Sequence, residues 1–146
     1  MDNWTIRWLD GGRDDLTDAF GIRLEVFCRE QGYAPEMELD EIDRLACHVL
    51  ICQEEVPVAT GRLYRKADGV CGLGRIAVRR QWRGRGLGAL VVEKLTEKAR
   101  DWGAIQTELD AQEQAVGFYQ KQGYVLCGER HMDGHVPHRM MRCNLF

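Results

Sequence analysis

The segment from Gly74 to Leu95, GRIAVRRQWRGRGLGALVVEKL, joins an apolar stretch to a periodic one through alternating glycines and arginines. The first part is typical of a strand. In the last part, apolar residues recur every three or four positions, as on one face of an amphipathic helix. Such a turn places unpaired backbone N–H groups and the positive end of the helix dipole at one point. The segment therefore predicts a site for a ligand that carries phosphates.

The side chains of this turn support that prediction. Glycines at alternating positions remove the side chains that would keep a phosphate away from the backbone, and arginines bind phosphate through paired hydrogen bonds. A plain turn with solvated arginines is disfavoured because strand, glycines and helix occur together. The glycines are Gly84, Gly86 and Gly88, and the arginines are Arg79, Arg80, Arg83 and Arg85.

Two familiar phosphate-binding motifs fit less well. Gly84, Gly86 and Ala89 match the GxGxxA of a dinucleotide-binding unit. That unit is expected in the first βαβ of a chain, however, whereas this segment follows an antiparallel meander. A P-loop is excluded because no Lys-Ser/Thr pair follows the glycines. A third interpretation of the turn is a site for the pyrophosphate of coenzyme A.

The rest of the chain predicts a mixed α/β order without repeats or linkers. Apolar and alternating stretches predict strands, helical spacing predicts helices, and the Asp-Gly pairs at 68–69 and 133–134 indicate hairpin turns. The expected strands cover residues 4–9, 47–52, 58–65, 70–78, 105–110, 124–130 and 138–144, and the expected helices 15–30, 87–102 and 112–122.

Composition narrows the classes of function. The net charge of −3 conflicts with nucleic-acid binding through the arginines. The six cysteines form no CxxC pair, no apolar run reaches the length of a membrane span, and the first residues do not form a signal peptide. The simplest expectation is a cytoplasmic protein with reduced thiols that has neither nucleic acid nor a membrane as a partner.

The stretch QWRGRGLG resembles the Q/R-x-x-G-x-G/A signature of the GNAT superfamily of N-acetyltransferases, with Gln81, Gly84 and Gly86 at the matching positions. RIAV resembles the family's fourth strand, and AVGFYQKQGY resembles its later helix with a Phe-Tyr pair. EVFCREQGY, DRLACHVL, LDAQEQAVGFYQKQGY and DGHVPHRMM are similar to the ElaA-like branch. The resemblance implies one mixed α/β N-acetyltransferase domain over residues 1–146. Its central, mostly antiparallel sheet would be splayed between strands four and five and flanked by helices.

In this family the splayed strands hold acetyl-CoA, which is therefore the expected cosubstrate. The backbone of Ile76, Ala77 and Val78 would bond the pantetheine arm, and amides of the turn would bind the pyrophosphate. Which arginine reaches the 3′-phosphate stays open among Arg79, Arg80 and Arg85. The resemblance extends the cofactor site to Gln81, Arg83, Gly84, Arg85, Gly86, Leu87, Gly88, Ala89 and Phe118.

The implied reaction is direct attack of a primary amine on the acetyl thioester. A lysine-like amine is mostly protonated at neutral pH, and freeing it costs roughly 4–5 kcal/mol, so a general base is needed. Tyr119 matches the family's tyrosine acid, which protonates the leaving thiolate. Some members carry a glutamate base at the start of the fourth strand, where this chain has Gly74 and Arg75. The candidates for the base or for acceptor contacts are Glu30, His48, Asp110, Glu129 and His138.

The acceptor side is less defined. The histidines of ERHMDGHVPH suggest a metal, but alternation along a strand, a turn and a strand should separate their side chains, and no metal is expected. An acidic run from Glu36 to Asp43 either attracts a cationic amine or is a solvated loop. The expected partner is a small-molecule amine, and a homodimer is left open. The alternative function is a non-catalytic acyl-CoA-binding or sensor module with the same fold.

Overall fold

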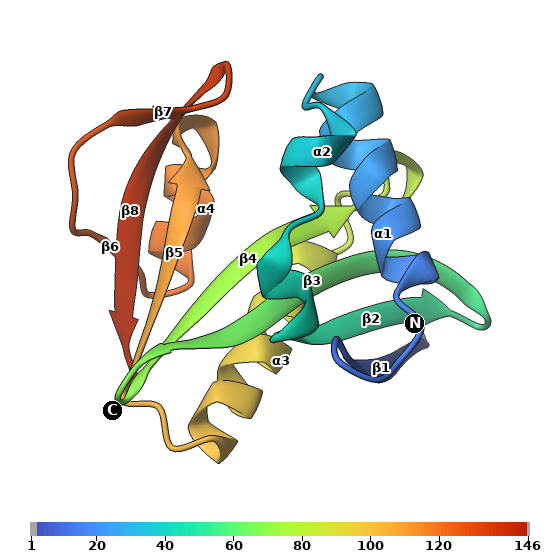
Figure 1. Ribbon diagram of the computed structural model, residues 1–146, viewed down its shortest axis with the longest axis horizontal. Helices are drawn as coiled ribbons and strands as arrows, with labels where there is room; N and C mark the ends of the chain where they lie inside the picture. The colour runs from blue at the N-terminus through green and yellow to red at the C-terminus, as the bar shows by residue number, and fades with distance from the viewer. Residues whose placement is uncertain (1–2, 146) are drawn as a thin grey trace.

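The computed structural model describes residues 3–145, in which eight strands form a single sheet (Figure 1). Their spatial order is β1-β2-β3-β4-β5-β8-β6, with β7 paired to β8. The strands are β1 (Trp4–Asp10), β2 (Cys47–Gln53), β3 (Val56–Ala67), β4 (Val70–Val78), β5 (Gln106–Gln112), β6 (Val125–Leu126), β7 (His131–Asp133) and β8 (Val136–Asn144).

The sheet is split between β4 and β5. β1 to β4 pair antiparallel along most of their lengths, whereas β4 and β5 pair in parallel only from Val70 to Gly72. Beyond these residues the two strands diverge, as Figure 1 shows above the C-terminus. β8 then continues antiparallel to β5. The expected mixed, mostly antiparallel sheet, splayed between its fourth and fifth strands, is confirmed.

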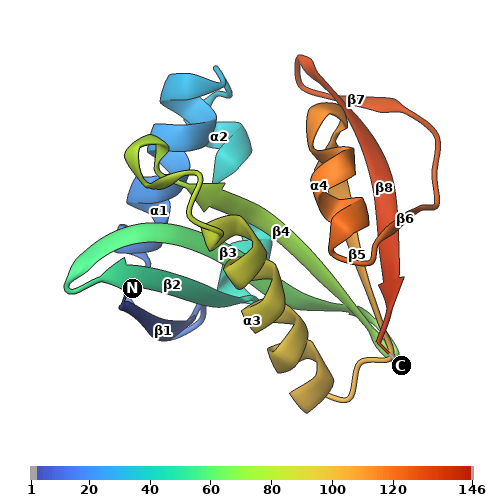
Figure 2. The ribbon, with the colours of Figure 1, turned by 180° about the vertical axis from the view of Figure 1, so that it is seen from behind.

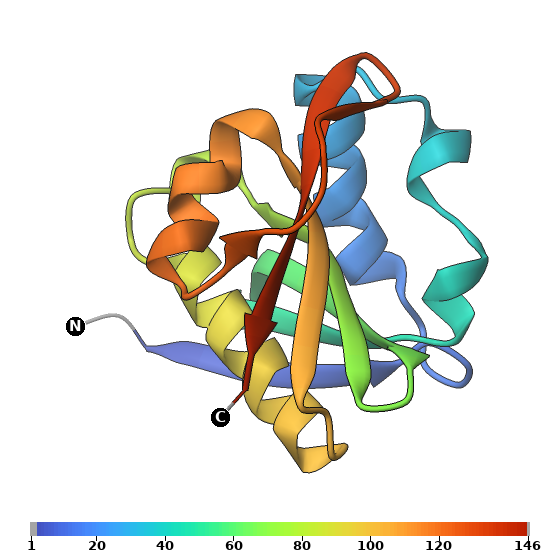
Figure 3. The ribbon, with the colours of Figure 1, turned by 90° about the vertical axis from the view of Figure 1, so that its left-hand side faces the viewer.

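Helices cover both faces of the sheet. On one face lie α1 (Thr17–Arg23), its π-helical continuation η1 (Leu24–Glu30) and α2 (Pro35–Glu38). On the other lie α3 (Leu87–Asp101) and α4 (Val116–Lys121), seen in front in Figure 2. Figure 3 shows α1 and α4 on opposite sides of β5. Short 3₁₀ turns form η2 (Glu41–Arg44), η3 (Arg80–Trp82) and η4 (Glu113–Ala115).

The two helical layers explain the composition of the central strands. One buried cluster lies under α1, and a larger one lies under α3 and α4. β2, with the sequence CHVLICQ, is buried on both of its faces because helices cover both sides of the sheet. None of the helices in residues 3–145 is both long and apolar enough to cross a membrane.

Arg75 marks the point where β4 leaves β5. Its φ of 51° lies in the left-handed region, which is unusual for a residue other than glycine. The register between β3 and β4 also shifts here, because Thr60 faces Ala77 whereas Arg62 faces Gly74. The extra residue forms a β-bulge, and a bulge bends its strand and increases the local twist. This bend directs β4 away from its neighbour.

Two predicted boundaries are wrong near the C-terminus. Leu126 pairs with Met141, and His131 pairs with His138. Between these two pairs the chain advances by five residues from Leu126 to His131 but by only three along β8. The excess residues leave the ladder, and the expected strand 124–130 shrinks to β6. The expected helix 112–122 begins later, at Val116, because pairing with β8 extends β5 to Gln112.

Candidate active site

The divergence of β4 and β5 opens a cleft with a cavity of about 650 Å³. Its walls come from β4 on one side, from β5 and α4 on the other, and from the start of α3. From Leu73 to Val78, β4 pairs with β3 alone among the described strands, so one edge of its backbone faces the cleft. Backbone N–H and C=O groups without a strand partner are available to a ligand that adds itself as a further strand.

The glycine turn forms part of the cleft wall. Gly84 and Gly86 have φ values of 79° and 78°, a left-handed conformation that favours glycine. A side-chain carbon at either position would meet no described atom within 4 Å. Gly86 is also the N-cap of α3, and the first backbone N–H groups of a helix lack helical partners. The turn therefore offers uncrowded backbone donors at the positive end of a helix dipole, as an anion site requires.

The arginines of the turn are partly engaged by the protein itself. Arg83 holds the carboxylate of Glu30 through contacts of 2.9 and 3.0 Å and donates from Nε to the carbonyl oxygen of Val78 at 3.0 Å. The guanidinium of Arg85 lies 4.9 Å from the ring centre of Trp82. Glu30, an expected base or acceptor contact, therefore balances the charge of Arg83 and does not line the cleft.

Most of the residues expected to bind the cofactor line the cleft. Gln81 and Arg85 are the exceptions, since both are exposed and neither belongs to the cleft wall. The expected cofactor-binding residues that line the cleft are Ile76, Ala77, Val78, Arg83, Gly84, Gly86, Leu87, Gly88, Ala89 and Phe118. The fold thus brings a strand, a turn and a distant helix to one cavity.

Tyr119 lines the cleft from α4. Its ring packs edge-on against Phe118 and Tyr124, with centroid distances of 5.0 and 6.0 Å. Burial raises the pKa of the Tyr119 hydroxyl, so this group stays protonated at neutral pH. Within residues 3–145 no side chain or carbonyl oxygen hydrogen-bonds to it, which leaves its proton for a ligand.

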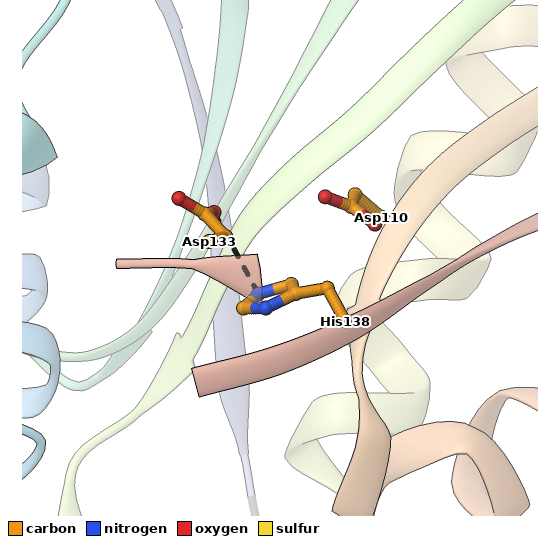
Figure 4. Close-up of side chains that lie close together, drawn as sticks. All are labelled: Asp110, Asp133 and His138. Atoms are coloured by element: carbon orange, nitrogen blue, oxygen red, sulfur yellow. Dashed lines mark ion pairs between the residues drawn. The ribbon is translucent and has the colours of Figure 1, made fainter. Parts of the chain in front are cut away.

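Asp110, Asp133 and His138 converge on the cleft from β5, β7 and β8 (Figure 4). Nδ1 of His138 lies 3.0 Å from the carbonyl oxygen of Val136, and Nε2 lies 3.7 Å from a carboxylate oxygen of Asp133. A carbonyl oxygen only accepts hydrogen bonds, so Nδ1 carries the proton of the neutral ring and Nε2 keeps its lone pair. The cluster therefore presents a nitrogen base beside a carboxylate.

The expected separation of the histidines by strand alternation is wrong. His131 and His138 face each other across the β7–β8 ladder, with ring centres 6.2 Å apart, because residues paired across two strands share a face. Nε2 of His131 lies 2.8 Å from the carboxylate of Asp110, and this hydrogen bond raises the pKa of His131. The register between β7 and β8 is set by the hairpin turn that joins them. Reasoning from that turn could have predicted that these two side chains lie together.

The same cluster has the composition of a metal site. Ligand atoms of Asp110, Asp133 and His138 lie within 4.8 Å of one another. Imidazole nitrogen and carboxylate oxygen are both ordinary ligands of Zn²⁺. The prediction that no metal binds depended on the alternation of side chains, and it loses that support here.

A clasp between residues 31–33 and residues 133–135 bridges the two walls of the cleft. Tyr33 donates its hydroxyl to the carbonyl oxygen of Asp133 at 3.0 Å, and Nε2 of His135 lies 2.6 Å from the carbonyl oxygen of Gln31. Gln112 donates to the side chain of Gln31 at 2.7 Å. No sequence pattern links these segments, which are about a hundred residues apart. The clasp holds Asp133 at the cleft.

Two members of the acidic run 36–43, Glu38 and Asp43, belong to a buried ion-pair network, whereas Glu36 and Glu41 are exposed. Arg23 binds Glu38 at 2.8 Å and Asp43 at 2.7 Å, and Arg62 binds Asp43 at 2.8 Å. Arg23, Glu38 and Asp43 are only 1%, 4% and 3% exposed. Arg75, from the cleft wall, adds a contact of 3.2 Å to Glu38. Because arginines neutralise Glu38 and Asp43, these two carboxylates do not favour a cationic acceptor.

Opposing effects set the pKa values in this network. Burial raises the pKa of Asp43, but the hydrogen bond and charge of Arg23, together with Arg62 and the backbone of Asp40, outweigh burial and lower it to about 2. For Glu38, burial prevails and the pKa is raised. Asp43 therefore contributes stability that is present above about pH 4 and is lost as the pH falls towards 2.

Two other base candidates lie outside the cleft wall. His48 is buried in β2, with Nε2 3.0 Å from the carbonyl oxygen of Asp43, and burial lowers the pKa of its ring. Glu129 is exposed, and neither it nor His48 lines the cleft. Asp110 and His138 are the candidates that the fold places at the cavity.

Comparison with known proteins agrees with this architecture. Residues 12–124 match the Acetyltransferase (GNAT) family. The match spans the helix α1, the strands β2 to β5, the glycine turn and the Phe-Tyr helix α4. The chain therefore belongs to the GNAT family of acetyltransferases.

Individual relatives support this assignment. The chain is 40% identical over 129 residues to the uncharacterized N-acetyltransferase YjcF of Bacillus subtilis, which covers 88% of this chain and 91% of YjcF. It is 38% identical over 130 residues to the uncharacterized protein YyaT of the same organism, with 87% of each chain covered.

Solved structures extend the likeness to the whole fold. Escherichia coli ElaA matches with a TM-score of 0.86 and 24% identity, over 97% of this chain and 100% of that chain. An acyl-CoA N-acyltransferase from Pseudomonas aeruginosa matches with a TM-score of 0.85 and 24% identity, over 97% and 99%. At this identity the likeness is one of fold alone.

Proposed function

We propose that this protein is an acetyl-CoA-dependent N-acetyltransferase that moves an acetyl group to a primary amine of a small molecule. The observation that carries the proposal is a single cavity in which the free edge of β4 meets the glycine turn at the start of α3. A free strand edge suits an amide-bearing arm, and a helix start suits a pyrophosphate. Acetyl-CoA carries both groups.

The names of relatives favour the same chemistry. YjcF is described as an N-acetyltransferase, and the Pseudomonas aeruginosa neighbour as an acyl-CoA N-acyltransferase. On this basis the backbone from Ile76 to Val78 holds the pantetheine arm, and the turn from Arg83 to Ala89 holds the pyrophosphate. Six free cysteines fit a reducing compartment, so we place the reaction in the cytoplasm.

The reaction is direct attack in a ternary complex. The amine nitrogen attacks the carbonyl carbon of the thioester, the C–S bond breaks, and the coenzyme A thiolate leaves. Backbone N–H groups near Ile76, on the free edge of β4, polarise the carbonyl. Tyr119, whose hydroxyl is protonated and has no partner among the described residues, donates to the leaving sulfur.

Acetyl-CoA and a panel of primary amines test the function directly. We expect release of coenzyme A that depends on the amine, detected with a thiol reagent, and an acetylated amine detected by mass spectrometry. The panel should include polyamines, aromatic amines, amino acids and amino sugars. A protein that binds acetyl-CoA yet releases no thiol with any amine would instead be a non-catalytic acyl-CoA-binding or sensor module.

The variant Gly86→Val should weaken acetyl-CoA binding about 10- to 100-fold. Its side chain would cover backbone donors at the start of α3, and one hydrogen bond to a charged group is worth about 1.5–3 kcal/mol. The affinity is measured by isothermal titration calorimetry.

Gly103→Val is the matched control for backbone strain. Gly103 has a φ of 85°, a side-chain carbon there would meet no described atom within 4 Å, and it follows the other end of α3. The two variants therefore carry similar strain, but Gly103→Val should leave the affinity unchanged. Equal losses in both would assign the effect to strain and not to the phosphate turn.

A further inference from the structure

We propose that His138 is the general base of this reaction and that Asp133 stabilises the imidazolium that forms; the inference rests on the proposed N-acetyltransferase function. His138 is only 5% exposed, yet it lines the cleft together with Tyr119. Figure 4 shows its ring directed towards Asp133, with Asp110 nearby. The amine that attacks the thioester must lose a proton, and these three side chains form a titratable cluster in the cavity wall. Glu38 also lines the cavity, but Arg23 already holds its carboxylate at 2.8 Å.

The backbone decides which nitrogen of His138 can take a proton. Nδ1 donates to the carbonyl oxygen of Val136, so Nε2 holds the lone pair of the neutral ring. Nε2 lies 3.7 Å from the carboxylate of Asp133, too far for a hydrogen bond and close enough for attraction once the ring is charged. Nε2 therefore stays available to the amine.

The clasp gives Asp133 a fixed place. Its carbonyl oxygen accepts from the hydroxyl of Tyr33 at 3.0 Å, across the cleft from β7. His135, two residues further on, is held at the carbonyl oxygen of Gln31. Asp133 is thus a positioning residue, whose carboxylate acts through His138 and stabilises a charge that exists only after proton transfer.

Asp110 is the other candidate at the cavity, and its contacts disfavour it. Its carboxylate pairs with Nε2 of His131 at 2.8 Å, and the same hydrogen bond raises the pKa of His131. A carboxylate oxygen that already pairs with an imidazole nitrogen is less available to take a proton from the amine. An imidazole suits general-base catalysis at neutral pH far better.

The proton transfers balance over one turnover. The amine nitrogen forms a bond to the carbonyl carbon, and its surplus proton passes to Nε2 of His138. The C–S bond then breaks with its electron pair on sulfur, which takes the proton of Tyr119. His138 returns its proton to Tyr119 through water. When the acceptor enters as an ammonium ion, its first proton also passes through His138 and leaves to solvent.

Variants of His138 test the base with the amine that gives the fastest release of coenzyme A. For His138→Gln and His138→Ala we expect kcat to fall by about 100-fold or more, while the dissociation constant of acetyl-CoA is unchanged. Imidazole should restore part of the activity of His138→Ala, because it supplies the missing base. A weakly basic amine, unprotonated at neutral pH, should lose less rate than a strongly basic one.

Asp133→Asn tests the positioning role. It should lower kcat on the order of 10-fold while the dissociation constant of acetyl-CoA is unchanged, because the imidazolium formed during turnover loses its stabilising charge. The charged and titratable groups around His138 are Asp133 and His131 from β7 and Asp110 from β5. Asp68→Asn, in the other Asp-Gly hairpin turn and outside the cleft wall, is the matched control and should leave kcat unchanged.

Several outcomes would overturn the assignment while leaving the transferase function intact. One is wild-type turnover in His138→Gln. Another is a loss in His138→Ala that neither imidazole nor a weakly basic amine relieves. A third is loss of wild-type activity on chelation with recovery on adding Zn²⁺, which would assign the cluster to a metal. Absence of thiol release by the wild type with every amine would remove the proposed function as well.

Discussion

Replacing Arg23 with methionine should lower the free energy of unfolding by about 3–5 kcal/mol, because Glu38 and Asp43 would stay buried after losing one of their charged partners. Arg62 keeps a contact with Asp43 and Arg75 keeps one with Glu38, so the lower end of this range is expected. A domain typically has about 5–15 kcal/mol of stability, so the variant should still fold. Urea unfolding followed by circular dichroism measures the difference.

Arg44→Met is the control for this prediction. Arg44 also pairs with a carboxylate, Glu41, at 2.8 Å, but both side chains are largely exposed. Its removal should change the free energy of unfolding by less than about 0.5 kcal/mol. If Arg23→Met and Arg44→Met differ by less than about 1 kcal/mol, the buried network does not stabilise the fold as argued.

The buried network also bears on the cleft. Arg23 comes from α1, Arg62 from β3, and Arg75 from the bulge in β4. Their shared carboxylates, Glu38 and Asp43, belong to α2 and η2. The network therefore connects α2 and η2, which follow residues 31–33 in the chain, to β4, which forms one wall of the cavity.

Tyr119→Phe should lower kcat about 100-fold while the affinity for acetyl-CoA is unchanged. General acids contribute about 10²- to 10⁴-fold, and the raised pKa of Tyr119 makes it a weak acid, so the lower end is expected. An interaction made only in the transition state affects turnover and not ground-state binding. Steady-state kinetics with the best amine of the panel and titration calorimetry separate the two quantities.

Tyr124→Phe removes the hydroxyl of a neighbouring tyrosine and serves as the control. That hydroxyl lies 2.7 Å from Oγ1 of Thr107, is buried and does not line the cleft. Its loss should cost about 1 kcal/mol of stability and leave kcat unchanged. Wild-type turnover in Tyr119→Phe would show that Tyr119 is a packing residue.

Local patterns predicted most of the elements. Alternation and helical spacing depend on neighbouring residues, so the strands β1 to β5 and the helix α3 appear close to their expected positions. The resemblance supplied the splayed topology, which the pairing of β4 with β5 over three residues confirms. The left-handed φ values at Gly84 and Gly86 give a second reason for glycine in the turn, beside the access to the backbone that the sequence reasoning named.

Predictions that needed register or long-range pairing were wrong. More residues lie between the β6 and β7 pairings than along the matching part of β8, so only part of the expected strand 124–130 forms. The same register places His131 opposite His138. Neither interpretation of the acidic run foresaw that Glu38 and Asp43 are buried, because their arginine partners lie well away along the chain, at Arg23, Arg62 and Arg75. A side chain's charge is visible in the sequence, but its burial depends on what packs over it.

The sequence by itself determined the order of the elements, the glycine turn at the start of α3 and the family, because each depends on residues that are adjacent or regularly spaced. Only the tertiary structure decided which of the candidate bases reach the cavity. It buried His48, paired Glu30 with Arg83, and brought His138 and Asp110 to the cleft wall. The physical reason is that these positions depend on strand register and on the clasp across the cleft, which join residues far apart in the chain.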